Sequence, residues 1–264
     1  MAKPDPIPVI DIFAGPGGLG EGFASLRSRG RPVFRIQLSI EMDEFAHRTL
    51  LLRSFFRQFL NGEVPSSYYE YLRGEQKWRG ASCDALLDAF PKHGERARAE
   101  AWREELRPSI AATVDARIGR ALGPRRSRPL WVLVGGPPCQ AYSLAGRSRM
   151  RGEQGDRFYA DKRHTLYREY LRLLGRHAPP IFIMENVKGL LSATSRNGSF
   201  VFERILADLR CPPGSPHRYH LFALSRGEGS NGQLFTDEHD PGNFVVECER
   251  HGIPQARHRV IILG

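Results

Sequence analysis

Apolar runs separated by glycine-rich or polar segments divide the chain into predicted strands and helices. The runs IPVIDIFA at 7–14 and PVFRIQLSIEMD at 32–43 predict two strands, the second ending near Glu41. A glycine-rich turn over Gly15–Gly20 and a helix over Leu19–Leu26 are predicted between them. Strand, turn, helix and strand together indicate a βαβ unit, which is typical of α/β proteins with parallel sheets.

The stretch from residue 44 to about 128 has a different pattern, being helix-like and heavily charged. FAHRTLLLRSFFRQFL and GERARAEAWREELRPSIAATVDARIGRAL both favour helix, and the basic linker GPRRSRP follows them. Because this stretch is long for a plain crossover between parallel strands, it predicts a helical insertion at about 50–128. Its charges indicate a solvated face.

Later apolar runs predict the rest of the sheet. Leu130–Val134 predicts a strand buried on both faces, and PPIFIMENV at 179–187 predicts another. YHLFAL, FVVECER and RVIILG predict the last strands, while 165–177 and Phe200–Leu209 predict helices. The polar, arginine-rich segment Gly146–Lys162 predicts a long mobile loop. The whole pattern indicates an α/β architecture with a mostly parallel sheet.

The amino-acid composition indicates which kind of binding partner the chain has more than it indicates the fold. The hydrophobic share of 41% supports a substantial core, and the net charge of +10 favours a polyanionic partner, although a merely basic protein is the alternative. The four cysteines form no CxxC pair, so neither a metal site nor a disulfide framework is indicated, and a reducing, cytosolic setting fits. We find no signal peptide and no apolar stretch of about 20 residues, so no membrane association is expected.

GPGGLG at 15–20 follows a predicted strand, precedes a predicted helix and fits the pattern GxGxxG. Glycines let a backbone approach a ligand closely, and Glu41 lies where an acid after the second strand binds ribose hydroxyls. The pattern alone suits a nicotinamide cofactor equally well, or a nucleoside cofactor with an amino-acid tail. A tight turn that serves packing alone is the remaining interpretation.

GGPPCQAYS at 135–143 places Cys139 in a loop at the carboxyl end of a predicted central strand. Gly135 and Gly136 end the strand, and two prolines then prevent both helix and ladder pairing. Ligands of open α/β sheets bind at such strand ends, which favours a nucleophile. A small buried hydrophobe is the alternative.

Two further motifs carry polar residues beside apolar runs. MENVKG puts Glu185 and Asn186 at the end of a buried strand, where burial raises a carboxyl pKa; the alternative is a turn-capping acid. GIPQARHRV sets Gln255, Arg257 and Arg259 at alternate positions entering a strand, so that they share one face. That face suits a phosphate or a base edge, or simply a solvated strand edge.

FAGPGGLGEGF, GGPPCQAYS, ENVKG and QARHR, in this order, closely resemble the DNA (cytosine-5) methyltransferases. The resemblance extends from about Val9 to Gly264 and leaves the helical insertion unmatched. It implies one catalytic domain over 1–264 with a Rossmann-like methyltransferase fold, helices on both faces of the sheet, and S-adenosylmethionine as cofactor.

The resemblance also implies a role for each residue that matches a family motif. Cys139 would attack carbon 6 of cytosine, Glu185 would hold ring nitrogen 3 and the exocyclic amine, and Arg259 would contact the base oxygen. Asn186 would orient the loop, and Arg257 would support the site or a DNA phosphate. The implied cofactor-binding residues are Phe13, Ala14, Gly15, Gly17, Gly18, Glu41, Met42, Pro138 and Leu166. The implied DNA-binding residues are Gln140, Ser143, Asn186, Gln255 and Arg257.

The implied partner is double-stranded DNA from which the target cytosine is flipped, in a restriction-modification context in the bacterial cytosol or nucleoid.

The chain departs from the family pattern in two ways. The acid that holds the adenine amine has no clear counterpart, although Asp84 is a candidate. The chain also stops at Gly264, so we expect the target-recognition region on a second polypeptide or in a longer protein. An RNA cytosine methyltransferase, a non-catalytic subunit and a nicotinamide dehydrogenase are the competing hypotheses.

Overall fold

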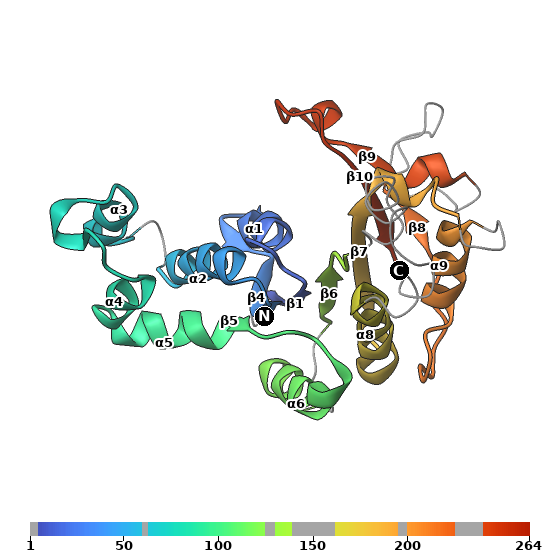
Figure 1. Ribbon diagram of the computed structural model, residues 1–264, viewed down its shortest axis with the longest axis horizontal. Coiled ribbons are helices and arrows are strands. Elements are labelled where there is room, and N and C mark those ends of the chain that lie inside the picture. Colours follow the sequence, from blue (N-terminus) through green and yellow to red (C-terminus); the bar gives the residue numbers. More distant parts are fainter. Residues whose placement is uncertain (1–4, 60–62, 125–129, 139–161, 195–199, 225–239) are drawn as a thin grey trace, which may run out of the picture. The chain divides into compact units, whose positions relative to one another are not determined.

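The computed structural model describes residues 5–59, 63–124, 130–138, 162–194, 200–224 and 240–264. The chain folds into two compact units, each formed from two segments: Met1–Glu105 with Arg120–Pro129, and Leu106–Gly119 with Leu130–Gly264. Both units combine strands with helices, so the predicted α/β class is confirmed (Figure 1). Among the described helices, none has the length and apolar composition that a membrane span requires.

The first unit is built on three parallel strands in the order β5–β4–β1. These are β1 (Ile7–Ile12), β4 (Phe34–Glu41) and β5 (Ala101–Arg103), and α1 (Gly18–Ser25) lies between the first two in sequence. The apolar runs that predicted β1 and β4 form the buried parts of these two strands, because a parallel strand is covered on both faces. The predicted βαβ unit is therefore confirmed.

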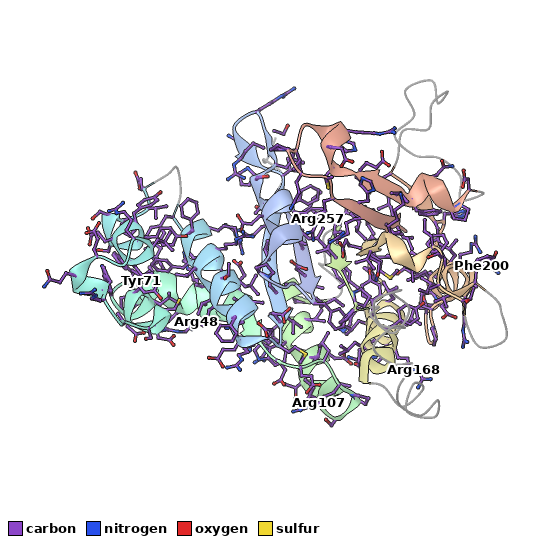
Figure 2. All side chains as sticks on the ribbon, turned by 45° about the horizontal axis from the view of Figure 1, so that its top comes forward. Arg48, Tyr71, Arg107, Arg168, Phe200 and Arg257 are labelled. Atoms are coloured by element: carbon purple, nitrogen blue, oxygen red, sulfur yellow. The ribbon has the colours of Figure 1, made fainter. Side chains whose placement is uncertain are left out.

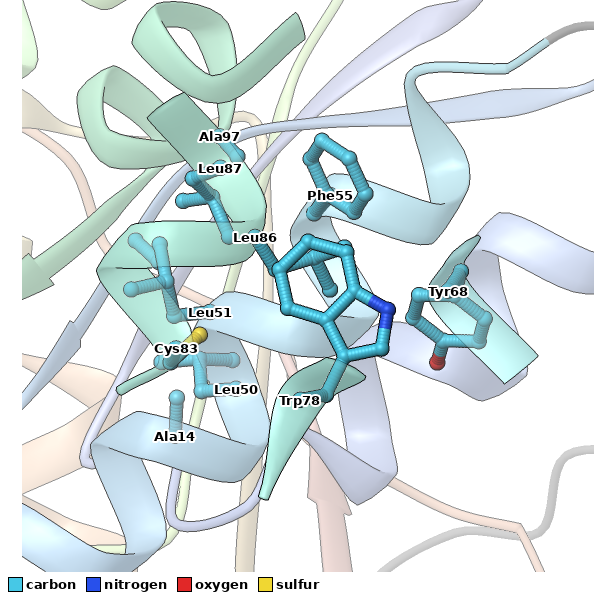
Figure 3. Close-up of a cluster of buried hydrophobic side chains, with 11 residues drawn as sticks. Ala14, Leu50, Leu51, Phe55, Tyr68, Trp78, Cys83, Leu86, Leu87 and Ala97 are labelled. Carbon is cyan, nitrogen blue, oxygen red and sulfur yellow. The ribbon is translucent and has the colours of Figure 1, made fainter. Parts of the chain in front are cut away.

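Two features between α1 and β5 add to this unit. A short antiparallel hairpin, β2 (Arg27–Ser28) with β3 (Arg31–Pro32), was not predicted from the sequence. The helices that follow β4 are α2 (Glu44–Arg57), α3 (Ser66–Leu72), η2 (Gln76–Trp78), α4 (Cys83–Asp88) and α5 (Pro91–Glu100). These helices, called the inserted helices below, share one buried cluster to which the turn after β1 and the strand β5 also contribute (Figure 3). Its members are Ala14, Leu50, Leu51, Phe55, Tyr68, Trp78, Cys83, Leu86, Leu87, Ala97 and Ala101.

The helix predicted across GERARAEAWREELRPSIAATVDARIGRAL is wrong in its middle. α5 ends at Glu100, and β5 follows directly, pairing Ala101 with Ser39 and Arg103 with Glu41 of β4. Helix resumes only at η3 (Pro108–Ile110) and α6 (Ala111–Leu122). Pairing with the buried β4 outweighs the helical propensity of these three residues, as tertiary context commonly does.

The second unit holds a mixed sheet in the order β6–β7–β10–β8, with β9 also paired to β10. β6 (Val132–Gly135) and β7 (Ile181–Val187) are parallel, and β10 (His258–Leu263) runs antiparallel to β7. The other elements are α8 (Lys162–His177), α9 (Val201–Arg210), β8 (Phe222–Ala223), β9 (Val245–Glu247), η5 (Lys188–Leu190), η6 (Pro241–Phe244) and η7 (Cys248–His251). The predicted strands and helices of this half are confirmed in position, but two strands are shorter than predicted: FVVECER is strand only over Val245–Glu247, with Cys248 onward in η7, and YHLFAL only over Phe222–Ala223.

Candidate active site

The turn between β1 and α1 has an unusual backbone. Phe13, Gly15 and Gly17 all have positive φ, of 56°, 55° and 90°. A Cβ on Gly17 would come within 2.8 Å of Leu50 Cδ1 on α2, so any side chain there would have to displace Leu50, and the φ of 90° itself favours glycine. Phe13 is not a glycine, and backbone outliers of this kind concentrate at functional sites. The strained turn therefore marks this end of β1 as a candidate ligand site.

Glu41 lies at the end of β4 and is bonded to this turn. Its Oε2 accepts a hydrogen bond from the Gly15 backbone N–H at 2.7 Å, and its Oε1 accepts one from the Asp43 N–H at 2.7 Å. The structure thus brings together the predicted glycine turn and the predicted acid. Because a carboxylate has about four acceptor positions, Glu41 can still accept ribose hydroxyls beside these two donors.

The surroundings of the turn leave room for a ligand. A Cβ placed on Gly15 or Gly18 would meet no atom within 4 Å. Met42, directly after Glu41, is 50% exposed, whereas Ala14 is buried. Two other predicted cofactor residues belong to the second unit, where Pro138 is half-buried and Leu166 is buried in α8.

Asp11 is a residue of this turn region that sequence reasoning missed. It lies in β1, is fully buried, and has no hydrogen-bonding partner for either carboxylate oxygen in the described structure. Burial raises the pKa of Asp11 to about 7, although the nearby Arg57 guanidinium opposes that rise. The signal was present in the sequence, because an acid between Ile10 and Ile12 interrupts an otherwise apolar strand.

Glu104 is a second acid that the sequence pattern concealed. It directly follows β5, and its backbone N–H donates a hydrogen bond to the Glu41 carbonyl at 3.1 Å. Asp84, the earlier candidate for an acid at the end of the third strand, instead lies on α4 in an ion pair with Arg98 at 2.9 Å. Glu104 could not be assigned from sequence because β5 itself was taken for helix.

The second unit contains a separate cluster around Glu185. Arg259 of β10 donates from Nε to Glu185 Oε1 at 2.8 Å, and Arg259 Nη1 donates to the His258 carbonyl at 2.8 Å. Arg259 lies opposite Val187 in the antiparallel ladder, so it shares a sheet face with Glu185 two residues earlier. The register of β7 and β10 therefore positions the ion pair.

Gly136 provides space for the other oxygen of Glu185. A Cβ on Gly136 would lie 2.8 Å from Glu185 Oε2, closer than real Cβ contacts allow. Any side chain at this position must displace the carboxylate. The second glycine of GGPPCQAYS is thus required by contact with a motif about 50 residues away in sequence.

Asn186 ties the same two motifs together through its side chain. Asn186 Nδ2 donates to the Pro137 carbonyl at 3.0 Å, and Asn186 Oδ1 accepts from the Val187 N–H at 2.9 Å. With 4% of its surface exposed, this side chain is placed to orient the loop after β6 and is not available for a direct DNA contact.

The electrostatics of Glu185 combine burial with nearby positive charge. Partial burial raises the pKa of Glu185, whereas the Arg259 and Arg257 guanidinium groups lower it. The net pKa remains above the ordinary value of a glutamate. A carboxyl group in this condition exchanges a proton closer to neutral pH than a solvated one does.

The predicted alternation of Gln255, Arg257 and Arg259 along one strand face is wrong. β10 begins at His258, so Gln255 and Arg257 precede the strand, and both are exposed. Figure 2 labels Arg257. Gln255 N–H donates to the Ile253 carbonyl at 2.7 Å, which closes a local turn instead of extending the ladder. Pro254 disfavours ladder pairing just before this point.

Several predicted residues lie outside the described structure. These are Cys139, Gln140 and Ser143, together with residues 146–161 of the predicted loop. The described chain reaches Pro138, the last residue before Cys139. The three cysteines that it does contain, Cys83, Cys211 and Cys248, are free thiols.

Comparison with known proteins finds a family match over the segment that contains GGPPCQAYS and MENVKG. Residues 129–211 match the model of the family described as C-5 cytosine-specific DNA methylase. A Bacillus paralicheniformis protein named type II methyltransferase M.Bpa9945I is 29% identical, over 97% of this chain and 53% of the relative. The Aeropyrum pernix DNA (cytosine-5-)-methyltransferase M.ApeKI is 32% identical, over 50% of this chain and 26% of the relative.

Among solved structures, the Entamoeba histolytica methyltransferase EhMeth aligns with a TM-score of 0.44 and 13% identity, covering 98% of this chain and 53% of that one. Where the match extends along nearly the whole chain, as with the Bacillus protein, this chain spans about half the length of the relative.

Proposed function

Because the chain belongs to the C-5 cytosine-specific DNA methylase family, we propose that it carries the catalytic part of a DNA (cytosine-5) methyltransferase. In this function a methyl group passes from S-adenosylmethionine to carbon 5 of a cytosine flipped out of double-stranded DNA. The type II names of relatives support a restriction-modification role, in the bacterial cytosol or nucleoid.

The observation that carries the proposal is the arrangement around Glu185. Oε1 is held by Arg259, while Oε2 lies in the space that the absence of a side chain at Gly136 provides. A base seated beside Glu185 would meet a carboxyl group with a fixed orientation and a raised pKa. That combination suits a group that donates a hydrogen bond or a proton to ring nitrogen 3 of cytosine.

The chemistry requires a nucleophile because carbon 5 of cytosine is unreactive until carbon 6 has been attacked. We assign that attack to the Cys139 thiolate, which follows Pro138 at the end of β6. The new sulfur–carbon bond turns the ring into an enamine-like species, and Glu185 stabilises the electron density displaced toward nitrogen 3. After methylation, loss of the carbon 5 proton to solvent re-forms the double bond between carbons 5 and 6 and expels the Cys139 thiolate.

Arg259 would serve two purposes in this scheme. Its Nε fixes Glu185, and its Nη2 is the nitrogen that we assign to the oxygen of the base. Asn186 would hold the Pro137 carbonyl, and thereby the start of the loop that carries Cys139. Gln140, Ser143, Gln255 and Arg257 are proposed to contact the DNA around the flipped nucleotide.

The residues of the first unit fit the proposed cofactor. Gly15 and Gly18 leave the open space that a closely approaching nucleoside and amino-acid tail need, and Glu41 retains acceptor positions for ribose hydroxyls. Phe13, Ala14, Gly17 and Met42 complete the proposed pocket in this unit, and we add Glu104 as the acceptor for the adenine amine. Pro138 and Leu166, which belong to the second unit, are also proposed as cofactor-binding residues. When bound, S-adenosylmethionine supplies the electrophilic methyl group.

Sequence selectivity is proposed to reside in a target-recognition region outside these 264 residues, on a second polypeptide or in a longer protein. An RNA methyltransferase shares the motifs, so substrate class needs a direct test. Transfer of tritiated methyl groups to duplex DNA and to transfer RNA should label only the DNA. Labelling of RNA alone would replace this proposal, and calorimetric binding of a nicotinamide dinucleotide instead of S-adenosylmethionine would overturn it.

A further inference from the structure

Arg57 occupies the meeting point of three helices in the first unit. It lies in the last turn of α2, which Figure 1 shows between α1 and α5. Arg57 Nη1 donates to Glu21 Oε1 of α1, and Arg57 Nη2 donates to Glu100 Oε1 of α5. The Arg57 side chain is only 14% exposed, and each of its two terminal nitrogens is paired with one of these carboxylates.

The α5 end of this bridge is held more firmly than the α1 end. Glu100 Oε2 also accepts from Gln58 Nε2 at 3.1 Å, and Ser54 Oγ donates to the Ala97 carbonyl of α5 at 3.3 Å. The Glu100 side chain is 10% exposed, whereas that of Glu21 is 38% exposed. Arg57 of α2 is therefore anchored to α5 through Glu100, and its other terminal nitrogen binds Glu21 of α1.

α1 needs such external support because its own sequence is a poor helix former. It has eight residues, GLGEGFAS, and three of them are glycines. Each glycine disfavours helix by about 1 kcal/mol relative to alanine, and helices this short are marginal on their own. Its ring contact between Phe23 and Phe34, with centroids 4.9 Å apart, supports only the far end of the helix.

The bridge reaches the part of α1 that adjoins the strained turn. The Glu21 N–H donates to the Gly17 carbonyl at 2.9 Å, so Glu21 lies one helical turn beyond Gly17. Beneath this first turn, a Cβ on Gly20 would lie 3.1 Å from Oδ2 of the buried Asp11. Fixing Glu21 consequently fixes the backbone N–H groups that follow the glycine turn.

We propose that Arg57 is a positioning residue for the cofactor-binding turn, and that the inserted helices serve to hold Arg57 against α1 through Glu21. This inference rests on the proposed function, in which residues 13–18 bind S-adenosylmethionine. It gives the inserted helices a role in cofactor binding although none of α3, α4 or α5 belongs to the proposed pocket.

The decisive variant is Glu21→Gln, which releases α1 while leaving Arg57 paired with Glu100. Titration of S-adenosylhomocysteine into the full chain by calorimetry should show affinity reduced about five- to tenfold, the effect of losing one hydrogen bond of ordinary net strength. Hydrogen exchange at the backbone amides of residues 17–22 should accelerate. The unfolding temperature should change little, because Glu21 is partly exposed.

Two comparisons separate positioning from plain stability. Glu100→Gln loosens the anchor of Arg57 on α5, so it should lower both the unfolding temperature and the cofactor affinity, whereas Glu21→Gln should lower the affinity with little change in unfolding temperature. Glu75→Gln, which removes an exposed ion pair with Arg73, should change neither quantity. Unchanged affinity and unchanged exchange in Glu21→Gln would overturn the proposal.

Failure of the proposed function would give a different result. A wild-type chain that binds neither S-adenosylmethionine nor S-adenosylhomocysteine would contradict cofactor binding at this turn, and with it any positioning role of Arg57. If the wild type binds but Glu21→Gln alters only exchange and not affinity, the bridge is structural and the positioning proposal is wrong.

Discussion

Two glutamates end parallel strands in the two units, and their different partners prepare them for different tasks. Glu41 at the end of β4 is held by two neutral backbone N–H groups, those of Gly15 and Asp43, each at 2.7 Å. Glu185 near the end of β7 is held by the Arg259 guanidinium at 2.8 Å, and burial raises its pKa.

The comparison shows that the end of a strand places a glutamate in a site, whereas the groups that donate hydrogen bonds to its carboxylate determine the chemistry that the glutamate can perform. Backbone donors fix the Glu41 carboxylate in one orientation, which suits an acceptor for hydroxyl groups. A guanidinium partner combined with burial leaves Glu185 close to exchanging its proton, which suits acid–base work. The predictions below alter one of these glutamates, or its immediate setting, at a time.

Glu185→Gln should have the largest effect on activity. The amide keeps the shape but cannot supply a proton, so methyl transfer at saturating substrate should fall by about 10²–10⁴-fold, the usual contribution of a positioned acid or base. Calorimetry with S-adenosylhomocysteine on the same variant should give the wild-type affinity. Activity within a factor of two of wild type would show that Glu185 does no acid–base work.

Gly136→Ala, in the motif GGPPCQAYS, should displace the Glu185 carboxylate. The added methyl group would lie 2.8 Å from Glu185 Oε2, so the carboxylate must move. We expect at least about a tenfold loss of methyl transfer and a loss of stability of about 1–3 kcal/mol from overpacking. The matched control is Gly22→Ala on α1, where the new methyl group meets no atom within 4 Å; the control should retain full activity and stability.

Glu41→Gln should affect binding alone. The amide oxygen replaces only one of the two acceptors that Gly15 and Asp43 use, and the new NH₂ group cannot accept from them or from a ribose hydroxyl. Affinity for S-adenosylmethionine should fall about tenfold, while methyl transfer at saturating cofactor stays near the wild-type rate. A fall in the saturated rate with unchanged affinity would reverse the roles assigned to the two glutamates.

Asp11→Asn should mainly change how the stability of the protein depends on pH, and should change the activity less. Burial raises the pKa of Asp11 to about 7 from the ordinary 3.8, so the folded protein binds this proton more tightly than the unfolded chain. Stability therefore falls as pH rises from about 4 to 7, and the deficit above pH 7 is on the order of 4 kcal/mol.

Denaturant unfolding at several pH values tests this sign. The asparagine variant should resemble the protonated wild type, gaining stability over the wild type at pH 8 but not at pH 4. If the wild-type protein instead gains stability between pH 4 and pH 7 through Asp11, the variant would lose stability at pH 8, and the buried carboxyl must then be paired in solution.

Much of the fold could be predicted because its strands are buried on both faces. Apolar runs bounded by glycine, proline or charged residues indicate five of these strands, namely β1, β4, β6, β7 and β10. β5 could not be found this way, since Ala101, Trp102 and Arg103 lie within a glutamate- and arginine-rich helical pattern. Only pairing with β4, a contact between residues 62 or so positions apart, makes these three residues a strand.

The candidate site could be predicted as far as it depends on residue type at a strand end. The structure joins Glu41 to Gly15 and Glu185 to Arg259, as the motifs indicated. Side-chain environments could not be predicted, because they arise from contacts between distant segments. The requirement for Gly136 and the bond from Asn186 to Pro137 both belong to this class.

Covalent capture on DNA tests most directly whether the segment after β6 delivers a nucleophile to a base held by Glu185. The protein, supplied together with the polypeptide or segment that carries the target-recognition region, is incubated with S-adenosylmethionine and a duplex library in which 5-fluorocytosine replaces cytosine, so that any target sequence is present and the final elimination is blocked. Wild-type protein should form an adduct that survives denaturation, Glu185→Gln should form it far more slowly, and Cys139→Ser should form none. The absence of an adduct with wild-type protein, or its formation by Cys139→Ser, would contradict the mechanism.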